Sequence, residues 1–231
     1  MSAELTELME KLGYTFHDPS LLQTALTHSS YANERRDGTQ SNERLEFLGD
    51  SVLGVIASTY LFSHESGDEG SLSKLRASIV CEKALSSYSR SIGVGKYLLL
   101  GKGEKASGGA GRDSTLEDAF EAIVAAIFLD GGMGAARRFA LPFLERELHN
   151  QRQRKFKDYK TLLQEIVQQT PEEHVTYVLT GESGPDHDKK FTAEVRLHSN
   201  VIGRGAGHSK KEAEQQAARE ALSLLGYPEG R

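Results

Sequence analysis

The sequence predicts a chain of two parts, a mostly α-helical region over about the first 150 residues and a smaller α+β module after it. Two observations predict this division. Apolar residues recur at helical spacing up to about residue 148, whereas further on they alternate with polar residues, which is the period of a β-strand. A chain of 231 residues is long enough for two such domains.

The first region is expected to consist of helices joined by short polar segments. Pro19 lies near the start of the second helix, where proline is tolerated, and the glycine pair at 131–132 signals a helix end. The segment 101–113 is rich in glycine and lysine and is expected to be mobile. The expected helices cover residues 5–12, 19 to about 28, 43–64, 72–92, 116–131 and 134–149.

The C-terminal module is expected to follow the order helix, three strands, helix. The basic stretch 150–157 before it is explained equally well as an interdomain linker or as a solvated helix end. The expected elements are a helix over 159–169, strands over 175–179, 191–197 and 200–207, and a helix over 209–225.

Three carboxylates lie inside one apolar helical segment. At about 100° per residue, Glu43, Glu46 and Asp50 fall within about 60° of one another, and Phe47 and Leu53 flank them. Acidic residues on a helix are ordinarily a solvated face, but carboxylates between large apolar groups need their charge compensated. A divalent metal ion is the usual compensation, so the segment predicts a metal site.

A second apolar segment brings further carboxylates. Asp118 and Glu121 are three residues apart and share one helix face. The two helices together would form an oxygen-only site of the kind that Mg²⁺ or Mn²⁺ prefers. Ser114 and Thr115 each begin a capping-box pattern, which would explain Glu117 or Asp118 as part of a helix start but leaves Glu121 unexplained.

Gly49 lies inside the first acidic helix, where glycine costs about 1 kcal/mol relative to alanine. Two explanations are equally good. Either the backbone approaches another group closely beside the site, or two helices pack tightly there.

The last helix begins with two cations. Ser209 and Glu212 form a capping box, which places Lys210 and Lys211 in the first turn, where positive charge opposes the helix dipole. An anion bound by the helix N-terminus and both lysines would explain this choice. The simpler explanation is two solvated lysines.

Composition places the chain among ordinary globular proteins, with 38% hydrophobic and 26% charged residues. The net charge of −5 comes from the first region, so it does not exclude nucleic-acid binding by the second. Neither a run of 18 apolar residues nor a signal-peptide pattern is present, so no membrane span is expected. The single cysteine, Cys81, excludes an internal disulfide and suits a reducing cytoplasm.

The sequence resembles the ribonuclease III family over essentially its whole length. Residues 42–50, Asn-Glu-Arg-Leu-Glu-Phe-Leu-Gly-Asp, resemble the family signature, and residues 117–122, Glu-Asp-Ala-Phe-Glu-Ala, its second acidic motif. Residues 184–191 and 209–214 resemble a double-stranded-RNA-binding domain. The resemblance implies an all-α ribonuclease III endonuclease domain over 1–149, a linker over 150–157 and an α-β-β-β-α double-stranded-RNA-binding domain over 158–228.

The resemblance implies roles for the acidic residues. Glu46, Asp118 and Glu121 would bind Mg²⁺, for which Mn²⁺ would substitute. Asp50 would complete the site and orient the attacking water, which makes it a catalytic residue together with Glu121. The family's accessory acidic positions are matched by Glu43 and Glu69.

The resemblance also implies an RNA-binding surface. Thr161 and Gln164 match positions that face the RNA minor groove, and His187 matches a loop that enters the next minor groove. The two lysines of the last helix match phosphate contacts across the intervening major groove. Many such modules carry a third lysine where this chain has Glu214, which would weaken phosphate binding unless the side chain faces away.

The function implied is a metal-dependent endoribonuclease that works as a homodimer. Each subunit would cut one strand of double-stranded RNA, leaving 5′-phosphate and 3′-hydroxyl ends with a staggered cut. Ribosomal RNA precursors and structured mRNA would be processed in the cytoplasm. The alternatives are a non-catalytic double-stranded-RNA-binding regulator, which the four central carboxylates disfavour, and a small-molecule phosphohydrolase, which leaves the C-terminal module unexplained.

Overall fold

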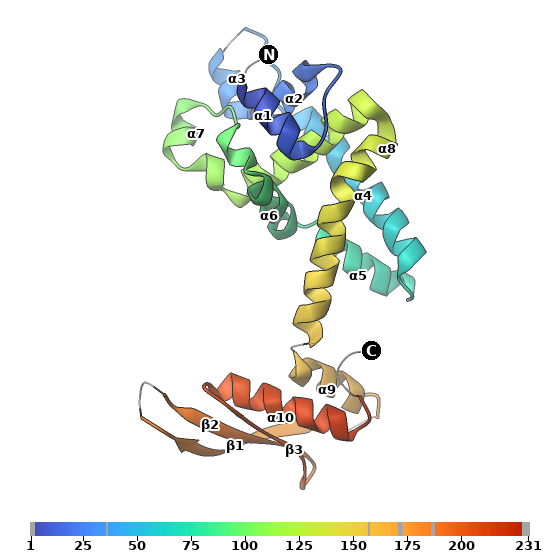
Figure 1. The fold of residues 1–231 in the computed structure, drawn as a ribbon, viewed down its shortest axis with the longest axis vertical. Helices are drawn as coiled ribbons and strands as arrows, with labels where there is room; N and C mark the ends of the chain where they lie inside the picture. Colours follow the sequence, from blue (N-terminus) through green and yellow to red (C-terminus); the bar gives the residue numbers. More distant parts are fainter. Residues whose placement is uncertain (1–2, 36, 157, 171–172, 186–187, 228–231) are drawn as a thin grey trace. The chain divides into compact units, whose positions relative to one another are not determined.

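The computed structural model describes residues 3–35, 37–156, 158–170, 173–185 and 188–227. The chain divides into two compact units, Met1–Leu148 and His149–Arg231 (Figure 1). The first unit is all-α, and the second combines helices with a three-stranded sheet. The predicted fold class is therefore confirmed.

The helical unit follows the predicted order closely, and the helix expected over 43–64 has those bounds. Its elements are α1 (Ala3–Leu12), α2 (Pro19–Ala25), α3 (Ser29–Arg35), α4 (Glu43–His64), α5 (Glu69–Ile79), α6 (Glu82–Ile92), η1 (Val94–Lys96), α7 (Lys102–Ala106), η2 (Gly109–Gly111) and α8 (Asp113–Phe156).

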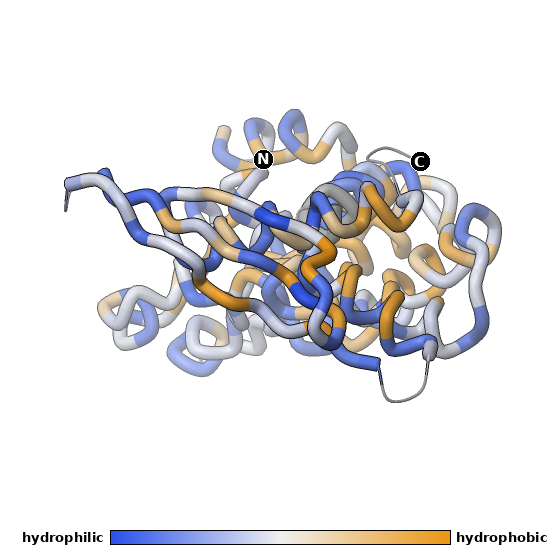
Figure 2. The backbone as a smooth tube through the Cα atoms, turned by 90° about the horizontal axis from the view of Figure 1, so that it is seen from below, coloured by the Kyte–Doolittle hydropathy of each residue, from blue (hydrophilic) through white to orange (hydrophobic). Residues whose placement is uncertain are grey.

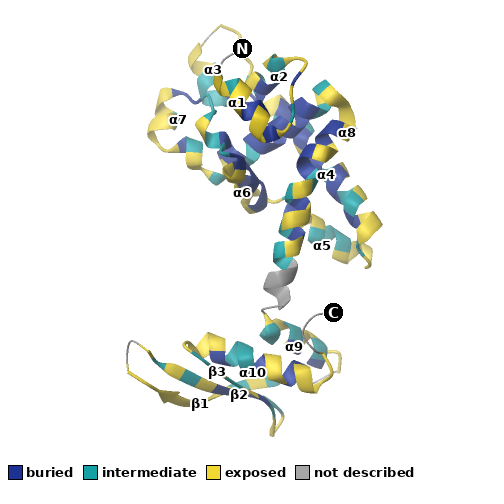
Figure 3. Ribbon diagram, viewed as in Figure 1, coloured by how far each residue is buried: buried dark blue, intermediate teal, exposed yellow. Residues whose placement is uncertain are grey.

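The core of this unit is built around α4 and the first half of α8 (Figure 3). Residues 119–127 of α8 are all buried, and Val52, Leu53 and Ile56 of α4 belong to the same core. By length and composition alone, α4 and α8 are apolar enough to cross a membrane, but core helices of globular proteins share this property. Within the apolar window of α8, 61% is buried inside the protein, as expected of a core helix.

The helix α8 bends at Gly132, whose φ of 75° is in the left-handed region that favours glycine. The bend confirms the predicted helix end. Phe120 before the bend packs against Phe139 and Phe143 after it, with ring centroids 5.5 Å apart in each pair. These aromatic contacts hold the two arms of α8 together. Beyond the helical unit, α8 continues as a helix to Phe156, through most of the stretch that the sequence left open as linker or helix end.

A buried carboxylate fastens this bend to the N-terminal helices. The side chain of Asp130 is 3% exposed. It accepts hydrogen bonds from the Tyr14 hydroxyl at 2.7 Å and from the backbone N–H groups of His17 and Asp18 at 2.9 and 2.8 Å. Burial alone would raise the pKa of Asp130, but these hydrogen bonds outweigh it and lower the pKa to about 2.

We expect Asp130→Asn to lower the free energy of unfolding by about 1–3 kcal/mol near neutral pH. The folded pKa lies below the unfolded value, so the carboxylate stabilises the fold above about pH 4, and this effect is lost as the pH falls towards 2. Urea unfolding of both proteins across this range should show the difference shrinking with acid. A difference independent of pH would contradict the assignment.

Two segments depart from the predicted helices. The second helix ends at Ala25 rather than near residue 28, because Thr27 forms a parallel bridge with Leu99 before a separate helix, α3, begins. The long helix expected over 72–92 is broken between α5 and α6. There the carbonyl of Ile79 accepts the hydroxyl of Tyr88 at 3.0 Å.

The glycine- and lysine-rich segment expected to be a mobile loop contains α7 and η2 instead. The Arg112 guanidinium pairs with Glu104 at 2.7 Å, and the N–H of Gly101 donates to the Ser30 hydroxyl at 2.9 Å. These contacts tie the segment to itself and to α3.

The second unit has the predicted order. Its elements are α9 (Tyr159–Val167), β1 (Val175–Ser183), β2 (Lys190–Leu197), β3 (Asn200–Gly207) and α10 (Lys210–Leu224). The strands form an antiparallel sheet in the order β1-β2-β3. Hydrophobic and hydrophilic residues interchange along them (Figure 2), and the inward residues meet α9 and α10 in a small core.

The glycines of β3 allow α10 to pack directly on the sheet. A Cβ on Gly203 would lie 2.3 Å from the carbonyl oxygen of Ala217, and one on Gly205 would lie 2.2 Å from its nitrogen. Larger residues would force the helix away. The glycine interruptions of this strand are therefore a packing requirement.

Candidate active site and nucleic-acid interface

The helix α4 carries the first three carboxylates from its first turn onward. Asn42, 3% exposed, precedes the helix, and its N–H donates to the carbonyl of Thr27 at 2.8 Å, which fixes where α4 begins. Glu46 is half-buried, and Asp50 is exposed. Leu53 is buried as predicted, but the expectation that Phe47 helps to enclose the cluster is wrong, because its side chain is 79% exposed. The enclosure comes from α8 instead.

Gly49 is the point where α4 meets α8. A Cβ at this position would lie 1.9 Å from the carbonyl oxygen of Glu121 and 2.9 Å from its Cα. Only glycine allows this approach. The sequence left open two explanations for Gly49, tight helix packing and close backbone approach beside the site. Both hold, because the two helices pack closely at Glu121, a residue of the second acidic motif.

The second motif lies at the start of α8, which begins at Asp113. Ser114 and Thr115 are inside the helix rather than before it, so the capping explanation for Asp118 is not supported. Asp118 is half-buried, and Glu121 is 8% exposed.

The electrostatics show that the carboxylates of the two helices act on one another. Burial, together with the charges of Asp50, Glu117, Glu46 and Asp118, raises the pKa of Glu121 to about 8. Burial and neighbouring carboxylates likewise raise the pKa of Glu46 and of Asp118. The structure therefore brings these four predicted residues, Glu46, Asp50, Asp118 and Glu121, into one acidic cluster.

The cluster includes charged residues that the sequence analysis did not assign to it. Burial and the charge of Glu82 raise the pKa of Glu117 to about 7, and Glu82 also raises the pKa of Asp118. The nearby imidazole of His28 instead lowers the pKa of Asp118. Glu117 is four residues before Glu121, so helical spacing was a usable signal for it. Glu82 and His28 come from other segments, and no local pattern indicates them.

The donor set fits a hard divalent cation, because every central group is a carboxylate. Burial, and after it the charges of neighbouring carboxylates, raise the pKa values of Glu117 and Glu121, so positive charge would be favourable there. In the part of the chain that the structure describes, no three His, Cys, Asp or Glu side chains stand close enough to hold an ion as they are. A bound ion would have to draw these side chains closer together.

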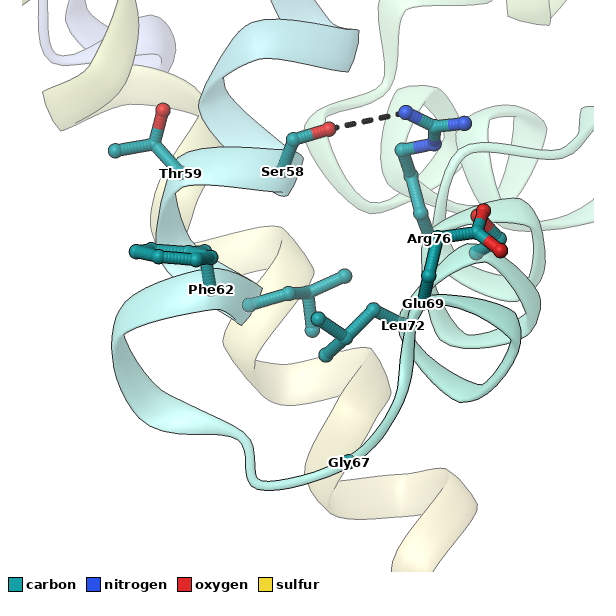
Figure 4. Close-up of a pocket in the computed structure, with 9 residues that line it drawn as sticks. Ser58, Thr59, Phe62, Gly67, Glu69, Leu72 and Arg76 are labelled. Carbon is teal, nitrogen blue, oxygen red and sulfur yellow. Dashed lines mark hydrogen bonds between the residues drawn. The ribbon is translucent and has the colours of Figure 1, made fainter.

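Glu69 lies apart from this cluster, at the start of α5. Its carboxylate accepts the Ser73 hydroxyl at 2.8 Å and lines a hollow of about 780 Å³ between α4 and α5 (Figure 4). Arg76, in the same hollow, donates to the hydroxyl of Ser58 at 3.2 Å. Within one chain, Glu69 is therefore not brought to the other predicted acids. Glu43, at the first turn of α4, is closer and contributes to the raised pKa of Glu46.

We expect Mg²⁺ or Mn²⁺ to raise the thermal stability of the protein, and a Glu117→Gln/Glu121→Gln variant to lose this response. The folded pKa values of Glu117 and Glu121 are raised, so without metal their contribution to stability is present at about pH 4 and lost as the pH rises to about 8. In EDTA, wild type should therefore lose several degrees of Tm relative to the variant between these pH values. If the Tm of wild type and the Tm of the variant changed equally with pH, the burial of Glu117 and Glu121 in this cluster would be contradicted.

The second unit exposes the predicted minor-groove residues on α9. Thr161 and Gln164 are both exposed and one turn apart. Asp158 caps this helix by accepting the N–H of Thr161. His187 lies outside the described residues.

The capping pattern before α10 is confirmed in its main feature. The Ser209 hydroxyl accepts the N–H of Glu212 at 3.1 Å, while the Glu212 carboxylate accepts the N–H of His208 at 2.8 Å. Lys210 and Lys211 follow in the first turn and are exposed. This arrangement leaves two cations at a capped helix N-terminus, which suits an anion.

Glu214, where a third lysine is common, faces α9. Its carboxylate pairs with the Lys160 ammonium at 2.6 Å, and that ammonium also lies 4.4 Å from the centre of the Tyr177 ring. The negative charge of Glu214 is thus matched inside the module. It is not presented alone beside the lysines of α10.

Comparisons with known proteins agree with both units. Residues 18–148 match the family model described as Ribonuclease-III-like, and residues 159–225 match the double-stranded RNA binding motif. Ribonuclease 3 of Caldanaerobacter subterraneus subsp. tengcongensis is 51% identical, with 96% of this chain and 98% of that protein covered. Ribonuclease 3 of Desulforamulus reducens is 48% identical, with 96% and 92% covered.

The solved nuclease domain of Ribonuclease III from Campylobacter jejuni is 40% identical and covers 62% of this chain and 97% of its own, with a TM-score of 0.57. It is described as showing structural flexibility in a region involved in dimer formation. Taken together, the fold, the site and these matches define an endoribonuclease that carries a double-stranded-RNA-binding domain. The chain belongs to the ribonuclease III family, in which activity depends in general on a divalent metal ion.

Proposed function

We propose that this chain is a Mg²⁺-dependent endonuclease that hydrolyses double-stranded RNA to 5′-phosphate and 3′-hydroxyl ends with staggered cuts. The observation that supports it best is the partly buried carboxylate cluster between α4 and α8, in a chain that also carries an RNA-binding module. The nuclease part is assigned to residues 1–149, the linker to 150–157 and the RNA-binding part to 158–228.

In this proposal Glu46, Asp118 and Glu121 hold the ion through their carboxylate oxygens, and Mn²⁺ can replace Mg²⁺. Magnesium, when bound, supplies the positive charge that activates water near neutral pH and neutralises the scissile phosphate. Asp50, which is exposed, accepts a hydrogen bond from the attacking water and orients it. Glu43 and Glu69 serve as accessory acids.

The RNA duplex is bound mainly by the second unit. Thr161 and Gln164 reach the minor groove, His187 enters the next minor groove, and Lys210 and Lys211 hold the phosphates between them. These contacts read shape, 2′-hydroxyl groups and phosphates, so sequence selectivity should be weak.

Two copies of the chain are proposed to act together. Phe47, Val55 and Phe62 are 79%, 53% and 81% exposed and lie within about 80° of one another on α4. Large exposed apolar side chains that share one helix face favour a contact surface. The description of the Campylobacter jejuni nuclease domain also supports a dimer.

The proposed cellular role is cytoplasmic processing of ribosomal RNA precursors and of structured mRNA. This role rests on the family relationship and on a substrate class defined by duplex shape.

The proposal is tested by incubating the protein with a long RNA duplex and with single-stranded RNA, in Mg²⁺, Mn²⁺ or EDTA. We expect metal-dependent cutting of the duplex alone, with 5′-phosphate ends. Tight duplex binding without any cutting would support the alternative, a non-catalytic RNA-binding regulator.

We expect replacement of Lys210 and Lys211 by alanine to weaken duplex binding uniformly across sequences. Each lysine that contacts a phosphate releases counterions, so the slope of log affinity against log salt should flatten by about one per lysine. A titration series in KCl measures it. An unchanged slope would mean that this helix N-terminus does not meet the phosphates.

A further inference from the structure

One carboxylate and one amide fasten the first turn of α9 to α10. The Asp158 Oδ1 accepts hydrogen bonds from the Thr161 N–H at 3.3 Å and from the Gln215 Nε2 at 2.9 Å. The Gln215 Oε1 accepts the N–H of Lys160 at 3.2 Å. Because a backbone N–H can only donate, the amide of Gln215 has one orientation, and Asp158 Oδ1 must be an acceptor.

The other oxygen of this carboxylate determines the hydroxyl of Thr161. The Thr161 Oγ1 lies 3.0 Å from the Asp158 Oδ2. An ionised carboxylate only accepts, so the hydroxyl hydrogen points at Asp158 and the exposed side of Thr161 carries oxygen lone pairs. The hydrogen bonds from Gln215 and Thr161 and the charge of Lys211 outweigh burial and lower the pKa of Asp158, so it is ionised at neutral pH.

We propose that Asp158 is a positioning residue that makes Thr161 an acceptor for the 2′-hydroxyl hydrogen of an RNA duplex, and thereby contributes to substrate choice. The inference rests on the proposed function, in which Thr161 faces the minor groove. The ribose hydroxyl supplies the hydrogen that Thr161 lacks on that side. Asp158 also caps α9, but its charge does not help the lysines to bind phosphate, since a carboxylate near Lys211 opposes phosphate binding.

The substitution Asp158→Asn tests this role because it keeps the size of the side chain and asparagine caps helices as well as aspartate does. Its oxygen is retained by the N–H of Thr161 and by Gln215, so its Nδ2 takes the place of Oδ2 and donates to Thr161. The threonine hydrogen then turns outward. The substitution reverses the polarity that Thr161 presents to RNA.

The measured quantity is a ratio of affinities in EDTA with the full chain. One probe is an RNA duplex, and the other is the same duplex with 2′-fluoro groups, which keeps the A-form but removes the hydroxyl donor. The ratio cancels the charge that Asp158→Asn removes. The ratio is the affinity for the RNA duplex divided by the affinity for the 2′-fluoro duplex. We expect Asp158→Asn and Thr161→Val each to lower this ratio about fivefold, and the double variant to lower it no further.

The matched control is Thr180→Val, which removes an exposed hydroxyl on β1 that donates to Thr192 and should leave the ratio unchanged. If Thr161→Val leaves the ratio unchanged, Thr161 does not meet the ribose, and the contact in the proposed function fails with this inference. If Thr161→Val lowers the ratio but Asp158→Asn does not, or if their effects add, this inference alone is overturned. Thermal unfolding of each variant confirms that the module is folded.

Discussion

Glu121→Gln is expected to lower the rate of duplex cleavage by about a thousandfold or more while duplex affinity changes less than about twofold. Glutamine keeps the shape of the side chain but removes the charge that a cation needs. Glu121 is 8% exposed and interacts with the charges of Asp50, Glu46 and Asp118, so no mobile surface acid can replace it. In the proposed function the duplex is bound mainly by the other unit, which this substitution does not change.

The cleavage rate is measured under single-turnover conditions in Mg²⁺, and duplex affinity is measured in EDTA. The matched control is Glu145→Gln, which changes an exposed glutamate further along α8 and should leave both quantities unchanged. Mn²⁺ affinity gives an independent readout, and it should fall for Glu121→Gln alone. A variant that cuts at the wild-type rate would show that the active site lies elsewhere.

The acidic cluster could be predicted from sequence to the extent that its residues belong to one helix face. Glu46 and Asp50 are about one helical turn apart, and Asp118 and Glu121 are slightly less than one turn apart. Spacing alone therefore groups these residues in pairs. Spacing cannot show that the pairs face each other, because that depends on how α4 packs on α8. It also cannot show Glu82, which reaches Asp118 from another helix.

The sequence predicted that Phe47 and Leu53 enclose the acidic cluster, and this was wrong for Phe47. An apolar side chain beside acids on a helix suggests enclosure, yet Phe47 is exposed and Leu53 is fully buried. The two differ by six residues, which places them about 120° apart on the helix, so they cannot both face the core. The helix has a core side and an outer side, and the acids lie between them.

Helix ends were predicted well where a glycine or a capping residue marks them. They were predicted poorly where a contact with a residue distant in the sequence ends the helix. The bend at Gly132 has a local cause in its positive φ. The break after Ile79 has none in the apolar pattern, because it involves the hydroxyl of Tyr88, nine residues on. Likewise, the direction of Glu214 depends on Lys160, which is 54 residues away.

Gly49→Ala is expected to destabilise the helical unit by about 2–4 kcal/mol and to lower cleavage activity with it. Alanine is favoured over glycine within a helix by about 1 kcal/mol, so local propensity alone predicts the opposite sign. Packing decides the outcome, because the added Cβ would lie 1.9 Å from the backbone carbonyl of Glu121. Backbone of a core helix cannot rotate away as a side chain can, so α4 and α8 must separate.

Gly134→Ala is the matched control for this prediction. It lies on α8, is exposed, and an added Cβ would find only the end of the Arg138 side chain at 3.5 Å. Propensity then acts alone, and Gly134→Ala should stabilise the protein by about 0.5–1 kcal/mol. Urea unfolding of both variants therefore separates the two effects by sign.

Separation of the helices also moves Glu46 and Asp50 away from Asp118 and Glu121, so Gly49→Ala should weaken Mn²⁺ binding even at temperatures where it remains folded. Normal metal affinity in a destabilised Gly49→Ala would mean that this contact supports the fold but does not set the spacing of the carboxylates.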